Sequence, residues 1–104
     1  MLPDYLFESI INTLTSNPEI TTSKMFGSQG LKIGGKVLAM LVKGKLVVKL
    51  PLQRVDELIA SGKGTRFDPG HGRIMKEWVA IEPRTYEDWL KLVEEARDYL
   101  SSAS

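Results

Sequence analysis

The sequence predicts an α+β fold, a two-layer sandwich of three helices and a five-stranded, mostly antiparallel sheet. Apolar residues recur at helical spacing in three segments, at residues 4–16, 51–60 and 85–100. Between these segments lie short apolar runs separated by glycine turns such as Gly34-Gly35 and Lys43-Gly44, as in hairpins. A chain of 104 residues suffices for one hydrophobic core. We therefore expect one domain over residues 1–104, with a frayed tail at 101–104.

The expected order of elements is α-β-β-β-α-β-β-α. The first helix ends before Asn17-Pro18, and a polar connector at 21–23 leads into a strand at 24–33 that bends at its two glycines. Two further strands are expected at 37–42 and 46–50. Pro51 opens the second helix and Gly62 ends it. Short strands at 65–67 and 77–81 flank a Pro/Gly loop, and Thr85 with Asp88 caps the last helix.

The register of the central hairpin determines which side chains share a face of the sheet. A two-residue loop at Lys43-Gly44 pairs Leu41 with Leu46, Ala39 with Val48 and Val37 with Leu50, on the face expected to take the helices. The opposite face then carries Leu38, Met40, Val42 and Val47 beside Lys45 and Lys49. A partly apolar second face indicates a dimer interface or a ligand surface. A bulged glycine in the loop would shift this pairing by one residue.

Charge is segregated along the chain. Residues 24–76 carry 11 Lys/Arg against 3 Asp/Glu, whereas the flanking segments 1–23 and 77–104 have net charges of −3 and −4. Basic strands and acidic helices that neutralise one another would explain this distribution. The alternative is a basic face for an anionic partner. The candidates for contact with nucleic-acid phosphates are Lys32, Lys36, Lys43, Lys45 and Lys49, although aromatic residues for base stacking are scarce among them.

The loop at 67–78 is the candidate ligand site. Its glycines allow backbone N–H groups to converge, and its basic residues add charge, which together resemble a small anion cradle. The candidate contacts are Gly70, His71, Gly72, Arg73 and Lys76. His71 is the only histidine and the chain has no cysteine, so we expect no metal site. Asp68 and Glu77 are too close to basic residues for their pKa values to separate as an acid–base pair requires, so no catalytic residue is assigned.

Several classes of protein are disfavoured by composition. Without cysteine the chain has no disulfide or thiolate site, and we expect no cofactor. The N-terminus lacks the basic and apolar pattern of a signal peptide, and no apolar run approaches the length of a membrane span of about 20 residues. A cytoplasmic location without membrane contact is therefore expected.

Four pieces of the sequence, taken in order, resemble one known family. They are Lys24-Met25-Phe26-Gly27, Gly30-Leu31, the strand that ends in Lys49-Leu50-Pro51, and the loop from Phe67 to Trp78. Together they resemble the TfoX N-terminal domain family from about residue 24 to about residue 100. The resemblance implies a two-layer α/β fold with helices on one side of an antiparallel sheet. The family takes its name from regulators of natural competence in bacteria, and it implies no catalytic residues.

These observations favour a non-enzymatic binding or regulatory module that acts through protein contacts, with transcription or competence as its context. The partner is another protein or a second copy of the chain, bound across the partly apolar sheet face. A nucleic-acid-associated protein that uses the basic central region is the leading alternative. A small enzyme or anion-binding protein that uses the 67–78 loop is the third.

Overall fold

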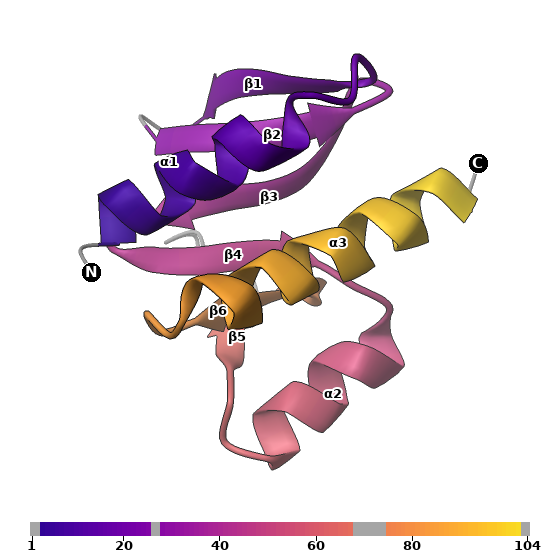
Figure 1. Cartoon of the computed structure of the whole chain (residues 1–104). Helices are drawn as coiled ribbons and strands as arrows, with labels where there is room; N and C mark the ends of the chain where they lie inside the picture. The colour runs from indigo at the N-terminus through magenta and orange to yellow at the C-terminus, as the bar shows by residue number, and fades with distance from the viewer. Residues whose placement is uncertain (1–2, 26–27, 68–74, 103–104) are drawn as a thin grey trace.

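The computed structural model describes residues 3–25, 28–67 and 75–102 (Figure 1). Three helices and six strands follow one another as α1 (Pro3–Leu14), β1 (Ile20–Met25), β2 (Ser28–Ile33), β3 (Lys36–Val42), β4 (Lys45–Lys49), α2 (Leu52–Ala60), β5 (Thr65–Phe67), β6 (Met75–Ile81) and α3 (Tyr86–Ser102). The strands form one antiparallel sheet in the order β1-β2-β3-β4-β6-β5. The predicted α+β class and the three helices are confirmed.

The sheet has six strands, and the prediction of five was wrong. The segment expected as one bent strand at 24–33 contains the end of β1 and all of β2, and these two strands pair antiparallel, with Met25 opposite Ser28 and Ile20 opposite Ile33. The threonines expected in a connector belong to β1, since β-branched residues favour extended backbone. Thr21, Thr22 and Lys24 of this edge strand are exposed, so β1 lacks the apolar alternation that marks a half-buried strand.

All three helices cover the same face of the sheet. Figure 1 shows α1 and α3 crossing this face, with α2 beside β5 and β6. The main core between the layers takes Phe7 and Ile10 from α1, Val55 from α2 and Trp89 from α3. The Trp89 indole Nε1 donates a hydrogen bond to the Glu82 carbonyl at 3.0 Å, which satisfies the one polar group that this large side chain buries. Helix periodicity predicted these buried stripes. It also placed Leu52 in the buried stripe of the second helix, and this was wrong, because Leu52 is exposed.

The C-terminal helix is longer than predicted. α3 runs to Ser102, so residues 101 and 102, which were expected in a frayed tail, are helical. None of the three described helices has the length and apolar character needed to cross a bilayer.

A bulge in β3 divides the predicted register into a correct part and a wrong part. Leu41 pairs with Leu46 and Ala39 with Val48, as expected. Beyond Ala39, the pairing of β3 with β2 shifts between Leu31 and Lys32, which leaves Leu38 as the extra residue. Leu38 therefore joins the main core beside Ala39, whereas Val37 turns to the opposite face. The expected pairing of Val37 with Leu50 does not form, because β4 ends at Lys49.

Candidate functional site

The face of the sheet opposite the helices carries a second apolar cluster. It is formed by strand residues alone, and we call it the strand cluster: Met40, Val47, Phe67, Trp78 and Ala80, with Val37 and Val42 packed against it. Every helix residue in an apolar cluster belongs to the main core on the other side. We call the face that carries the strand cluster the helix-free face, a term that refers to the helices of the described residues.

Three of the four predicted interface residues lie on the helix-free face. Met40, Val42 and Val47 belong to or border the strand cluster, whereas Leu38 was wrongly assigned and lies in the main core because of the β3 bulge. Met40 and Val47 are only 3% and 1% exposed. The apolar side chains that remain partly accessible here are Val37 and Val42, so the apolar area open to a partner is small.

Three of the five lysines considered for nucleic-acid contact share this face. Lys32 lies opposite Val37, and Lys45 and Lys49 alternate with Val47 along β4. The Lys49 ammonium lies 5.9 Å from the centre of the Trp78 ring, within range of a cation–π interaction. The other two lysines lie elsewhere, because Lys36 is opposite the core residue Ile33 and Lys43 occupies a hairpin turn with φ of 52°.

Ion pairs account for only part of the charge segregation. Within the basic segment, Lys45 pairs with Glu82 at 3.4 Å, Arg66 with Asp56 at 2.8 Å, and Arg54 with Glu95 at 2.8 Å. In the part of the chain that the structure describes, no ion pair forms at the other cations of this segment, which are Lys24, Lys32, Lys36, Lys43, Lys49, Lys63 and Lys76. Ion pairs between strands and helices therefore leave these seven described cations of the basic segment without an ion-pair partner.

The predicted loop site falls largely outside the described residues. Gly70, His71, Gly72, Arg73 and the paired-acid candidate Asp68 all lie between residues 68 and 74. Of the remaining candidates, Lys76 is an exposed residue of β6. Glu77 accepts a hydrogen bond from the Tyr99 hydroxyl at 3.2 Å and so joins β6 to α3. Within 3–25, 28–67 and 75–102, no group of three His, Cys, Asp or Glu residues is placed to hold a metal ion.

The Tyr99 phenol is perturbed by this contact. Partial burial raises the pKa of Tyr99, and the hydrogen bond and negative charge of Glu77 raise it further. Both effects favour the neutral phenol, which can donate to the carboxylate. The Tyr99–Glu77 contact is therefore a structural connection between sheet and helix.

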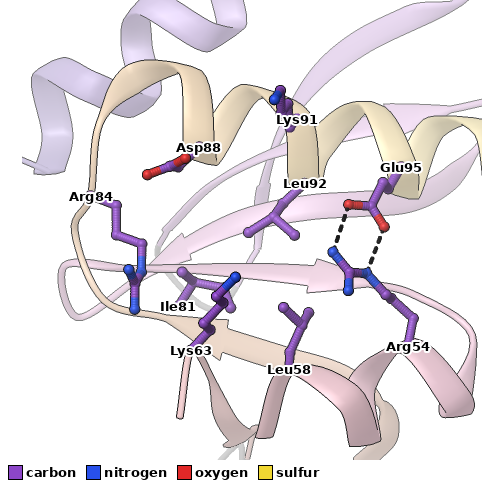
Figure 2. A pocket seen from close by; sticks show the side chains of 9 residues that line it. All are labelled: Arg54, Leu58, Lys63, Ile81, Arg84, Asp88, Lys91, Leu92 and Glu95. Atoms are coloured by element: carbon purple, nitrogen blue, oxygen red, sulfur yellow. Dashed lines mark hydrogen bonds and ion pairs between the residues drawn. The ribbon is translucent and has the colours of Figure 1, made fainter. Parts of the chain in front are cut away.

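A pocket of about 280 Å³ lies between α2, α3 and the end of β6 (Figure 2). Its floor is apolar, formed by Leu58, Ile81 and Leu92. Its wall is charged, and the residues that contribute are Arg54, Lys63, Arg84, Asp88, Lys91 and Glu95. Four cationic side chains therefore surround this apolar floor, with two carboxylates among them.

One ion pair closes one side of this pocket. Arg54 Nε donates to Glu95 Oε1 at 2.8 Å and Arg54 Nη2 donates to Glu95 Oε2 at 3.1 Å, the two-pronged geometry of a strong guanidinium–carboxylate contact. This hydrogen-bonded contact raises the pKa of the Arg54 guanidinium. Arg54 and Glu95 therefore neutralise each other and join α2 to α3.

Of the remaining cations of the pocket, Lys91 lies on α3, and Lys63 and Arg84 lie in connections between elements. After α2 the chain turns at Gly62, which has a φ of 77°, and the Lys63 N–H donates to the Leu58 carbonyl at 2.9 Å in a Schellman motif. Arg84 lies in the connection from β6 to α3. The sequence patterns do not predict this pocket. Its cations come from segments that are distant in the sequence. Only Gly62, the glycine predicted to end the second helix, indicated that the chain turns just before Lys63.

Comparison with known proteins identifies the family. No curated protein matches the chain. The model of the TfoX N-terminal domain matches residues 12–103, which include β1 to β6, α2 and the whole described length of α3. The resemblance noted in the sequence is thereby confirmed over most of the chain. The chain belongs to the TfoX N-terminal domain family.

Proposed function

We propose that the chain is a non-enzymatic binding module that contacts a protein partner through its helix-free face. The observation that carries the proposal is the combination, on the helix-free face, of lysines without an ion-pair partner and the partly accessible apolar residues Val37 and Val42. Lys32 and Lys49 have no ion-pair partner among the described residues. Val37 lies opposite Lys32 and Val42 lies opposite Lys45, and both valines border the strand cluster. Protein interfaces commonly combine an apolar centre with a polar, charged rim.

Charge indicates which kind of partner fits. In a symmetric dimer the same patch meets itself, so Lys32 and Lys49 would approach the same lysines of the second copy. Like charges at an interface oppose association, whereas acidic side chains opposite them favour it. A protein that offers Asp and Glu around a small apolar surface therefore fits better than a second copy of the chain. A role in transcription or competence, in the cytoplasm, is part of the proposal and rests on family membership alone.

Charge-reversal variants test this surface. The variant K32E/K49E reverses two lysines of the helix-free face, and K24E/K36E reverses two exposed lysines outside it with the same change in net charge. Each protein serves as bait for affinity capture, and the captured partner is then purified and titrated by calorimetry. We expect K32E/K49E to weaken binding by roughly tenfold, because two rim charges become repulsive. The K24E/K36E control should bind as the wild type does.

The opposite pattern would contradict the proposal. If K24E/K36E weakens binding as much as K32E/K49E, the effect comes from net charge and the helix-free face is not the interface. Equal binding by all three proteins would likewise place the interface elsewhere.

The placement of Lys32, Lys45 and Lys49 on one face supports nucleic-acid binding as a second candidate. Three cations along a sheet can follow backbone phosphates, with an affinity that falls as salt rises. Trp78 beneath Lys49 is only 8% exposed and offers little surface for base stacking, so a protein partner is favoured. Amide NMR with mixed duplex DNA at low and moderate salt separates the two. Salt-sensitive shifts at residues 32–49 would support DNA binding, and a flat response at low salt would reject it.

A further inference from the structure

We propose that the pocket between α2 and α3 binds a small organic oxyanion, a carboxylate or a phosphate ester with a compact apolar body. This site lies on the helix-covered side of the sheet, so it is independent of the helix-free face. It uses the cations of α2, α3 and their connections, none of which takes part in the proposed protein contact.

The charges of the pocket leave an excess of unpaired cations. Arg54 and Glu95 neutralise each other through two hydrogen bonds. In the described part of the chain, none of the cations Lys63, Arg84 and Lys91 forms an ion pair. Asp88 is then the one carboxylate of the lining that no ion pair engages. Three unpaired cations around one free carboxylate favour an anionic ligand.

The floor and the size of the pocket restrict the ligand further. Leu58, Ile81 and Leu92 line one side of the pocket and the charged residues line the other, so a ligand lies between an apolar floor and a charged wall. A volume of about 280 Å³ admits one small ring or short chain. The planar fork of Arg84 matches the two oxygens of a carboxylate or phosphate group. A single oxyanion on a compact apolar body meets all three conditions.

The pocket is built before any ligand arrives. The Arg54–Glu95 contact holds α2 against α3, and the Schellman motif fixes the backbone at Lys63. Gly64 then lets the chain approach β6 closely, since a Cβ on Gly64 would lie 2.6 Å from the Val79 side chain. A preformed site binds at a lower cost in conformational entropy than one that must first order its wall.

Amide NMR titration of the full chain tests the site. The probes are benzoate, phenyl phosphate and inorganic phosphate, with benzamide as the neutral analogue of benzoate. We expect saturable shifts around Lys63, Arg84 and Leu92 with either aromatic anion, with a Kd of about 1 mM for so small a ligand. Whichever of benzoate and phenyl phosphate has the lower Kd identifies the preferred oxyanion. Inorganic phosphate should bind more weakly, because it makes no use of the apolar floor.

Three variants separate a specific site from general attraction. K63Q/R84Q removes two pocket cations and should weaken binding by about tenfold, whereas K24Q/K36Q removes two remote cations and should leave it unchanged. D88N removes the free carboxylate and should strengthen binding by about threefold. All the substituted residues are exposed, so the fold should persist, which circular dichroism checks.

Several results would overturn the proposal. If K24Q/K36Q weakens binding as much as K63Q/R84Q does, the effect comes from the net charge of the protein. If benzamide binds as tightly as benzoate, the pocket does not recognise the negative charge. Shifts outside the pocket or without saturation would remove the site altogether. If inorganic phosphate binds as tightly as phenyl phosphate, the apolar floor does not contribute to binding.

Discussion

Tyr99 and Glu77 connect the C-terminal helix to the sheet through one hydrogen bond of 3.2 Å. Burial and the neighbouring carboxylate raise the pKa of the Tyr99 phenol above the ordinary value of about 10. Just above that ordinary value, the unfolded chain releases a proton that the folded chain keeps. The folded state therefore binds more protons than the unfolded state, and its stability falls as pH rises through 10 and beyond.

The substitution Tyr99→Phe should remove this alkaline loss of stability. At neutral pH the variant loses the hydrogen bond to Glu77, at a cost of about 1 kcal/mol in the free energy of unfolding. Above pH 10 the difference from the wild type should shrink, because the wild type alone loses the contribution of Tyr99. Urea denaturation at several pH values measures both effects. Tyr5→Phe, at a tyrosine that is 66% exposed, serves as the control. If the difference in the free energy of unfolding between the wild type and Tyr99→Phe stays constant across this pH range, the Tyr99 proton is not linked to folding.

The elements of the fold differ in how well the sequence predicts them. The buried stripes of helices such as α1 could be predicted because apolar residues occupy one face of the helix and polar residues occupy the other. The faces of β3 could not be fully predicted, since all six of its residues from Val37 to Val42 are apolar. Alternation between faces carries no information when both faces are apolar, so nothing in β3 revealed the bulge at Leu38. The polar edge strand β1 escaped prediction for the opposite reason, because it has too few apolar residues.

Alanine substitutions in β3 test the observed register. Leu38 is fully buried in the main core, whereas Val42 borders the strand cluster and is half-buried. Leu38→Ala should lower the free energy of unfolding by about 3 kcal/mol, through lost apolar contact and the cavity that remains. Val42→Ala should cost only about 1 kcal/mol, since fewer buried methyl groups are lost. Chemical denaturation gives both values. Similar costs for the two variants would indicate that Leu38 shares the helix-free face with Val42, as the unbulged register predicts.

At the scale of the whole molecule, the two candidate surfaces differ in what the sequence reveals. Two lysines of the helix-free face, Lys45 and Lys49, were predicted because they alternate with Val47 along one strand, whereas Lys32 was placed there only by the structure. The α2–α3 pocket was not, since Lys63 and Arg84 come together only through the path of the chain between α2 and α3. Local periodicity places residues on a face of one element, but it does not determine which faces meet. Sites within one strand are therefore easier to predict than sites between elements.

The two tryptophans report on opposite sides of the sheet and so test whether the chain unfolds as one unit. Trp89 is buried in the main core and Trp78 belongs to the strand cluster. Because the chain contains two tryptophans, Trp78→Phe leaves only Trp89 to fluoresce, and Trp89→Phe leaves only Trp78. If residues 1–104 form one cooperative domain, fluorescence and far-ultraviolet circular dichroism should give the same urea midpoint within each variant. Comparison within a variant is necessary because Trp89→Phe also loses the hydrogen bond to Glu82 and should be the less stable. Trp78 fluorescence that changes at lower urea than the dichroism would show that the helix-free face opens before the main core. In that case the strand cluster, with Met40 and Val47, would become accessible to a partner without global unfolding.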